Sequence, residues 1–245
     1  MKDPLGPVGR MWSIYKQGGL TPTVASILGS PSAGQMAFIR SAMRMQRQTS
    51  LLELPLRSLD AVVFDLETTG FHPYQGDEII SFGAVAVSGI DVQDKETFYS
   101  LSNPHRTIPH EIERLTGIAT EIAEAAPELI TALSQFLEFV QRRLLIAHGT
   151  GHDKQFLNAA LWKTSKINLT HRVLDTMMVA KWLHPALPTY DLDALLHLYD
   201  IPITDRHHAL QDSLMTAQLW VRMVDAITDR QVMTLGDLYM YLSRH

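Results

Sequence analysis

The sequence predicts an α/β fold in which helices flank a mixed β-sheet, and two observations carry this prediction. Residues 58–102 are rich in strand signals, because apolar segments with many β-branched residues alternate there with turn residues. From residue 144 onward, short apolar strands alternate with helical segments. A strand-rich first part followed by this alternation favours a sheet that combines antiparallel and parallel strands.

Four strands are predicted in order along the chain. "AVVFDLE" (61–67) and "EIISFGAVAV" (78–87) are separated by the turn "HPYQGD" (72–77), which indicates a hairpin. "KETFYSLS" (95–102) is the third strand, and "LLIAH" (144–148) is a short buried fourth strand.

The predicted helices fill the remaining segments. Residues 119–143 are helical, and Pro127 is expected to begin a second helix there because proline is favoured in the first turn. A helix at 153–163 follows the fourth strand, and residues 172–183 combine a strand end with a helix. Two more helices are expected at 191–200 and 208–227.

The composition is that of a globular protein of 245 residues, with 46% hydrophobic and 19% charged residues. The absence of cysteine excludes disulfides, thiolate metal sites and cysteine nucleophiles. The sequence shows neither a signal peptide nor an apolar run of transmembrane length, so we expect no membrane association and a cytoplasmic location.

The charge is unevenly distributed, which predicts two parts: a basic, partly helical extension at 1–57 and a main domain at 58–245. The extension holds seven Lys/Arg and two Asp/Glu, whereas the remainder holds 14 and 24. A helix is predicted at about 34–48, with Met36, Ile39 and Met43 on one face and a basic stripe, formed by Arg40, Arg44 and Arg47, on another. The favoured interpretation is packing on the main domain; the alternative is contact with nucleic acid or a partner.

Asp65 and Glu67 form the most informative pair in the sequence. They stand two residues apart on the first predicted strand, so their side chains point to the same face. Two adjacent carboxylates repel each other, and burial of either without a partner costs several kcal/mol. A cation between them would resolve this conflict.

Two further acids suit such a cation. Asp153 follows the strand at 144–148, and Asp212 lies one turn into the last long helix. Taken singly, Asp153 is more typical of a helix cap and Asp212 of an exposed helix position. The order of the motifs, D-x-E on a strand and then H-x4-D twice, favours a common site.

These three motifs, "FDLETTG" (64–70), "AHGTGHDKQFL" (147–157) and "RHHALQDS" (206–213), resemble those of the DEDD exonuclease superfamily. Within it the sequence is similar to the histidine (DEDDh) branch, the branch of the proofreading epsilon subunits of bacterial DNA polymerase III. The resemblance covers about residues 58–225. It implies a ribonuclease-H-like fold, two divalent metal ions, Mg²⁺ or Mn²⁺, and 3′-to-5′ hydrolysis of nucleic acid.

The resemblance also implies roles for individual residues. Asp65 would bridge the two metals, Glu67 and Asp212 would complete the first metal site, and Asp153 would act on the second largely through water. His207, five residues before Asp212, would be the general base, a task that suits the ordinary pKa of histidine near 6.5. Carboxylate ligands are those that Mg²⁺ and Mn²⁺ prefer.

A substrate pocket is implied around the first motif. Its expected members are Leu66, Thr68, Thr69, Gly70, His148 and His152, with Phe71 beside them. The second motif departs from the family form, which has Asn after the first His and Phe before the Asp, because Gly149 and His152 stand there. An imidazole can still stack on a base. His148 is expected either to bond the site or to orient its loop, and Asp175 to cap a helix.

A short segment, "QTSLL" (48–52), resembles the peptides by which bacterial polymerase proteins dock on the sliding clamp. Such peptides insert apolar anchors into a groove. The favoured interpretation is that Leu51 and Leu52 pack on the main domain, and clamp docking is the alternative.

Three functions follow from the sequence. The first is a DNA 3′-5′ exonuclease of repair or proofreading that acts on single-stranded 3′ ends, with a DNA polymerase as a potential partner. The second is a 3′-5′ exoribonuclease that acts on RNA ends or short oligonucleotides. The third, a catalytically inactive nucleic-acid-binding module, is disfavoured because all five catalytic positions are filled.

Overall fold

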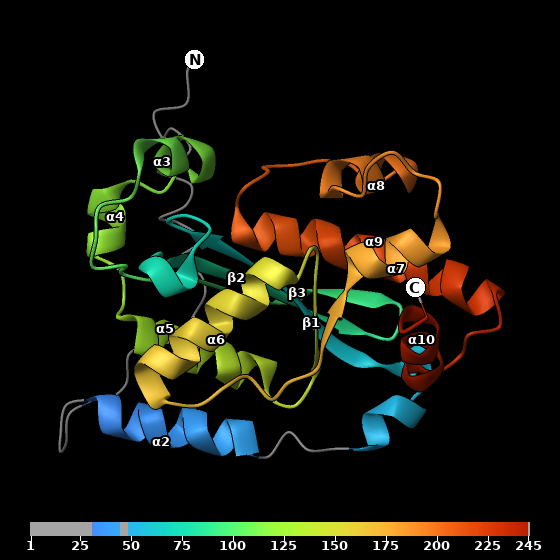
Figure 1. Ribbon diagram of the computed structural model, residues 1–245, viewed down its shortest axis with the longest axis horizontal. Coiled ribbons are helices and arrows are strands. Elements are labelled where there is room, and N and C mark those ends of the chain that lie inside the picture. Colours follow the sequence, from blue (N-terminus) through green and yellow to red (C-terminus); the bar gives the residue numbers. More distant parts are fainter. Residues whose placement is uncertain (1–30, 45–48, 245) are drawn as a thin grey trace.

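A five-stranded mixed sheet with strand order β3-β2-β1-β4-β5 forms the central layer (Figure 1). The computed structural model describes residues 31–44 and 49–244. The strands are β1 (Asp60–Thr68), β2 (Ile79–Ser88), β3 (Asp91–Leu101), β4 (Leu144–Ala147) and β5 (Val173–Asp175). β1, β2 and β3 pair antiparallel, whereas β4 pairs parallel with both β1 and β5. The predicted α/β class, hairpin and mixed sheet are confirmed.

Helices cover both faces of the sheet. One face carries α7 (Thr176–Leu183), α8 (Leu192–Leu198), α9 (Ala209–Asp229) and α10 (Leu235–Leu242). The other carries α2 (Pro31–Arg44), α5 (Leu129–Val140) and α6 (Gly151–Ser165). Two short helices, α3 (His110–Thr116) and α4 (Thr120–Glu124), lie at one end with their own small core. In the described ranges, no helix combines the length and the apolar character that a membrane span requires.

The alternation of side chains along β1 explains why the two faces have separate cores. Ala61 and Val63 belong to the core under α7–α10, whereas Val62, Phe64 and Leu66 belong to the core under α2, α5 and α6. β1 is therefore buried on both sides, as expected for the middle strand of a sheet that is covered twice. An acid on this strand lies close to the hydrophobic interior.

The structure places most predicted elements within a few residues of their expected bounds. The third strand begins at Asp91, four residues before the predicted start at 95. Pro127 does not begin the second helix of its segment; Glu128 is the N-cap and α5 begins at Leu129. The helices α3 and α10 were not predicted.

The described part of the N-terminal extension packs on the main domain. Ile39 and Met43 are buried in the core under α5 and α6, and Gln35 donates a hydrogen bond to Thr131. Arg40 and Arg44 are exposed, although Arg40 donates to the carbonyl of Ser165, and Arg47 lies outside the described residues. The packing interpretation of this helix is confirmed for residues 31–44. The boundary after residue 57 stays a prediction.

The clamp-like segment continues this packing. Residues Thr49–Glu53 form a short 3-10 helix, η1, and Leu51 and Leu52 pack partly buried against the core under α10. A second 3-10 helix, η2 (Leu56–Ser58), follows, and Leu56 donates its N–H to the carbonyl of Met233. Gln48 lies outside the described residues. Leu51 and Leu52 thus have the packing role, and clamp docking would require both side chains to leave the core.

Candidate active site

Three carboxylates meet at the carboxyl end of β1. Asp65 and Glu67 point to the face that α9 covers, because they share the alternation of Ala61 and Val63. Asp212, in the first turn of α9, faces them from the side of the sheet that α9 covers. One oxygen of each carboxylate lies within 4.8 Å of the others. The predicted convergence of Asp65, Glu67 and Asp212 is therefore present in the structure.

A glycine on β2 allows this approach. Gly83 pairs with Asp65 across the β1–β2 ladder, and the first turn of α9 rests directly on it. A Cβ atom at position 83 would lie 2.1 Å from the backbone carbonyl carbon of Ala209. Only a residue without a side chain lets α9 come this close to the sheet.

Asp153 completes the acidic site from the other side. β4 runs parallel to β1, so the loop after β4 returns to the same edge of the sheet, where α6 begins. Asp153 is 4% exposed in the first turn of α6, and the main chain of Leu66 favours the charged form of its carboxyl group. It lies outside the group of three oxygens within 4.8 Å, which fits the expectation that it acts through water.

Burial and mutual repulsion shift the pKa values of these acids upward. Desolvation raises the pKa of Asp65 well above its usual value, and the charges of Asp153, Glu67 and Asp212 raise it further. The pKa of Glu67 rises to about 8, first through burial and then through Asp212. Burial also raises the pKa of Asp153 to about 7, although the main chain of Asp153 itself and that of Leu66 act in the opposite direction. Such a cluster must hold either protons or a cation at neutral pH.

The donor atoms at this site suit a hard divalent cation. The three ligand atoms that converge here are carboxylate oxygens, the type that Mg²⁺ and Mn²⁺ prefer. Asp212 Oδ1 is buried and has no hydrogen-bond partner among the described residues. A buried acceptor without a donor is costly, and a cation at this position would satisfy it. The residues present therefore fit a metal site.

The two adjacent histidines have different environments. His207 adopts a left-handed backbone conformation (φ 61°), and its backbone N–H donates a hydrogen bond to Asp212 Oδ2 at 3.1 Å. His208 is the N-cap residue of α9, and its ring stacks on Tyr99 of β3 at a centroid distance of 4.7 Å. Burial lowers the pKa of His208. His208 thus has a packing contact of its own, whereas His207 is tied directly to a metal-ligand candidate.

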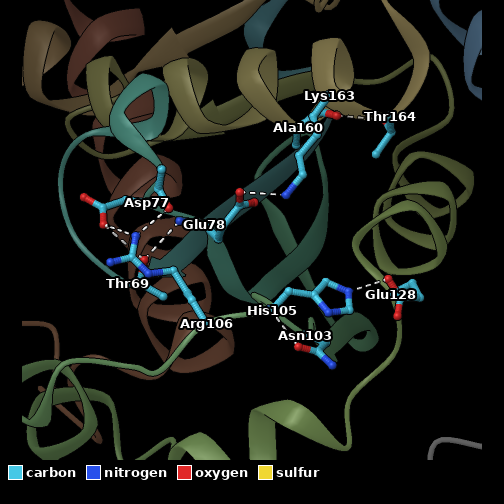
Figure 2. Close-up of polar contacts among 11 residues, drawn as sticks. Thr69, Asp77, Glu78, Asn103, His105, Arg106, Glu128, Ala160, Lys163 and Thr164 are labelled. Atoms are coloured by element: carbon cyan, nitrogen blue, oxygen red, sulfur yellow. Dashed lines mark hydrogen bonds and ion pairs between the residues drawn. The ribbon is translucent and has the colours of Figure 1, made fainter.

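The turn after β1 is held by a carboxylate that sequence reasoning missed. Asp77 accepts hydrogen bonds from the hydroxyl of Thr69 (3.3 Å) and the N–H of His72 (3.0 Å). Arg106 forms an ion pair with Asp77 at 2.9 Å (Figure 2). Arg106 also donates a hydrogen bond to the carbonyl of Gly76. The predicted pocket residues Thr68, Thr69 and Gly70 therefore form a turn that Asp77 and Arg106 hold in place.

His152 lies against this turn. Its Nε2 is 3.2 Å from the hydroxyl of Thr68, which itself donates to the carbonyl of Gly70. Because a hydroxyl has a single proton, Nε2 of His152 is the donor in this pair. The imidazole also contacts the rings of Phe71 (5.7 Å) and Phe156 (4.6 Å). Phe71 is 73% exposed, so the rings of His152 and Phe71 form one aromatic edge of the site.

His148 and Leu66 are placed differently from the rest of the expected pocket. The ring nitrogens of His148 bond the hydroxyl of Thr176 and the carbonyl of Tyr190, each at 2.9 Å. This arrangement fits the loop-orienting role rather than substrate contact. The side chain of Leu66 is buried in the core, and only its main chain borders the site.

Asp175 has the capping role that the sequence predicts. It is the N-cap of α7 and accepts a hydrogen bond from the N–H of Met177. It also accepts from the backbone N–H groups of Gly149 and Thr150, both at 2.9 Å. Asp175 thereby fixes the loop that leads into Asp153.

Arg206 is a second charged residue that sequence reasoning missed, and it contacts the acidic cluster directly. Its guanidinium forms an ion pair with Asp212 Oδ2, and its Nε bonds Asp193 of α8 at 2.5 Å. A cation directly before the H-x4-D motif was the only signal in the sequence. The charge of Arg206 lowers the pKa of Asp65 and of Glu67, in opposition to the larger effect of burial.

Known proteins have sequences similar to this chain. The model of the exonuclease family RNase_T matches residues 62–220. A DNA polymerase III subunit epsilon-like protein of Rhodobacter capsulatus is 34% identical over 200 residues, which cover 81% of this chain and 28% of that protein. The DNA polymerase III PolC-type of Bacillus subtilis is 33% identical over 70% of this chain and 12% of its own length. The chain thus spans less than a third of these two relatives.

Solved structures share the fold. Exonuclease X in complex with 5′ overhanging duplex DNA has a TM-score of 0.59 and 18% identity, and the match covers 74% of this chain and 99% of that one. The nuclease domain of 3′hExo bound to rAMP, a DEDDh family member, has a TM-score of 0.60 and 19% identity over 68% and 92% of the two chains. The resemblance inferred from the three motifs is confirmed by the family match over 62–220, and the chain belongs to the exonuclease family of nucleases.

Proposed function

We propose that this protein is a divalent-metal-dependent 3′-5′ exonuclease that hydrolyses phosphodiester bonds at the 3′ end of single-stranded DNA. The observation that carries the proposal is the convergence of Asp65, Glu67 and Asp212 within 4.8 Å around a buried, unpartnered oxygen of Asp212. A structural role does not explain this cluster, because repulsion and burial both disfavour it without a cation.

The residues divide the work as follows. Asp65, Glu67, Asp212 and Asp153 would together hold two divalent cations. Bound Mg²⁺ or Mn²⁺ would neutralise the charge that develops on the phosphoryl oxygens. His207 would take the proton from the attacking water, and the bond from its N–H to Asp212 fixes its backbone beside the metal ligands.

The substrate end is proposed to lie along the turn at Thr68, Thr69 and Gly70. His152 and Phe71 offer ring faces there, and aromatic rings stack on any base without regard to sequence. Asp77 holds this turn through its hydrogen bond with Thr69, and Arg106 holds Asp77 through an ion pair. A turn held in this way can position a terminal nucleotide.

The relatives favour DNA as the substrate and a replication setting. The Rhodobacter and Bacillus proteins carry the names of DNA polymerase III components, which supports association with a DNA polymerase. Exoribonuclease activity is the second candidate, because one structural neighbour recognises the 3′ end of a histone mRNA stem-loop and another is bound to rAMP.

Digestion of matched oligonucleotides tests both candidates. Single-stranded DNA, duplex DNA and single-stranded RNA of one sequence, each with a 5′ label, are incubated with Mg²⁺ or with Mn²⁺. The proposal expects a ladder of products shortened from the 3′ end, with single-stranded DNA cleaved fastest. Faster cleavage of RNA would favour the second candidate, and immediate release of the 5′-terminal nucleotide would contradict the 3′-5′ direction.

A further inference from the structure

We propose that a groove between η3 (Pro73–Gln75) and α6 binds the bases of single-stranded nucleic acid that lie upstream of the 3′-terminal nucleotide. The groove encloses about 170 Å³, and its walls include Tyr74, Ile79, Phe156 and Trp162. This inference rests on the proposed function and assigns a further binding site to the same substrate.

The exposure of the groove's aromatic side chains points to a ligand. Tyr74 is 72% exposed and Trp162 is 55% exposed, although both line the same hollow. An aromatic ring that serves packing is buried, since it gains most of its free energy from the area removed from water. Two exposed rings that line one groove, one from η3 and one from α6, provide stacking faces, and every nucleobase has a matching face.

The charge of the groove is compatible with a polyanionic ligand. Its two carboxylates are neutralised: Asp77 pairs with Arg106, and Glu78 pairs with Lys163 at 2.7 Å (Figure 2). Lys166 contributes a third cation, with its ammonium 5.8 Å from the ring centre of Trp162. Arg106 and Lys166 contact lining residues without lining the groove themselves; counted with Lys163 against Asp77 and Glu78, they leave one net positive charge, which would favour the phosphates of a strand.

Side-chain contacts link the groove to the active site. Phe156 lines the groove and contacts His152, which bonds the substrate turn at Thr68. Asp77 likewise lines the groove and holds Thr69 of that turn. From Asp153 to Lys163 is ten helical residues, roughly 15 Å at about 1.5 Å per residue. Successive stacked bases are about 3.4 Å apart, so the groove extends beyond the first nucleotide.

Binding of oligonucleotides of two lengths tests this inference. The Kd values for fluorescently labelled dT2 and dT12 are measured in EDTA, which prevents hydrolysis, with wild type and with Trp162→Ala and Tyr74→Ala. Each substitution should raise the Kd for dT12 by roughly 5- to 150-fold, the range for one stacked base, and should leave the Kd for dT2 unchanged. Trp162→Phe, which keeps a stacking face, should restore most of the affinity.

Tyr241→Ala is the matched control, because Tyr241 is an exposed aromatic residue of α10 outside the groove. It should leave both Kd values unchanged. Two results would overturn the groove assignment: equal Kd values of wild type and Trp162→Ala for dT12, or equal losses of affinity for dT2 and dT12. If the wild type still hydrolyses DNA, neither result contradicts the proposed function. A wild type that binds no dT12 would overturn the inference directly, and one that also fails to cleave any oligonucleotide would overturn the proposed function itself.

Discussion

Arg206 and Asp212 form an ion pair inside the metal-ligand cluster, on the same carboxylate oxygen that accepts the N–H of His207. The guanidinium is a monovalent cation that partly offsets the charge of three carboxylates. Asp193 holds its other side at 2.5 Å. Arg206 therefore stabilises the metal-free site and opposes cation binding at Asp212.

Arg206→Gln should bind Mn²⁺ about fivefold more tightly than wild type, which corresponds to about 1 kcal/mol for a partly exposed ion pair. The same change should lower the melting temperature in EDTA, since it removes a counter-ion. Isothermal titration with Mn²⁺ measures the affinity. Arg57→Gln, which removes an ion pair with Asp225 that includes none of the site's acids, should leave it unchanged. Weaker Mn²⁺ binding by Arg206→Gln would show that Arg206 does not oppose the metal.

Gly83→Ala should distort the active site through the start of α9. The added Cβ would lie 2.1 Å from the carbonyl carbon of Ala209, so α9 must move away from the sheet. We expect a loss of about 1–3 kcal/mol in the free energy of unfolding and a fall in activity on the order of 10²-fold. Urea unfolding and initial rates measure the two effects.

Gly34→Ala is the control for this substitution, because nothing lies within 4 Å of its Cβ position in α2. It should stabilise the protein by about 0.5–1 kcal/mol or leave it unchanged, because alanine favours helix. Full activity in Gly83→Ala would show that Asp212 does not depend on the close approach of α9.

The stability of the metal-free protein should fall as the pH rises from 5 to 8. The pKa of Glu67 rises from 4.5 to about 8 on folding and that of Asp153 from 3.8 to about 7. A raised pKa favours folding while the group is protonated, and this contribution is lost as the pH rises through the folded value. Melting temperatures in EDTA should therefore decrease across this range.

Saturating Mn²⁺ should remove most of that decrease. At a hundred times its Kd, a cation that binds only the folded state adds about 2.7 kcal/mol to the free energy of unfolding. The difference between melts in Mn²⁺ and in EDTA should be larger at pH 8 than at pH 6, and Glu67→Gln should flatten the EDTA curve. A difference that is equal at both pH values would contradict a carboxylate cluster that exchanges protons for metal.

His207→Ala should reduce the rate of hydrolysis on the order of 10²- to 10⁴-fold, the usual contribution of a general base. His208→Ala removes a stacking contact with Tyr99 and should act mainly on stability. Single-turnover rates and thermal melts of the two variants separate these effects. A larger loss of rate in His208→Ala would reverse the assignment.

The sequence predicted those parts of the molecule that depend on local patterns. The period-two alternation of β1 placed Asp65 and Glu67 on one face, and the helices around Asp153 and Asp212 followed from their apolar spacing. The helix α10 was missed although its capping box, Thr234 with Asp237, is readable in the sequence. The helix α3, between Pro109 and Gly117, was missed because a segment of seven residues is too short to show a helical periodicity.

The roles of Arg206, Asp77 and Gly83 could not be predicted. Arg206, in the turn before α9, meets Asp193 of α8, and Asp77 meets Arg106 at a separation of 29 residues. Such contacts depend on how elements pack in three dimensions, whereas the spacing of residues along the chain reports only one element at a time. Gly83 reads as an ordinary strand glycine until α9 is placed on top of it.

The rate of 3′-terminal nucleotide release from a 5′-labelled single-stranded DNA, measured against Mn²⁺ concentration for wild type and Asp65→Asn, tests the central claim most directly. The account predicts a wild-type rate that rises from zero in EDTA and saturates with Mn²⁺, and no release by Asp65→Asn at any Mn²⁺ concentration. Asp65→Asn should remain folded, with a melting temperature in EDTA at or above that of wild type, because a neutral amide relieves the repulsion among the acids. Nucleotide release by wild type in EDTA, or metal-dependent release by folded Asp65→Asn, would contradict it.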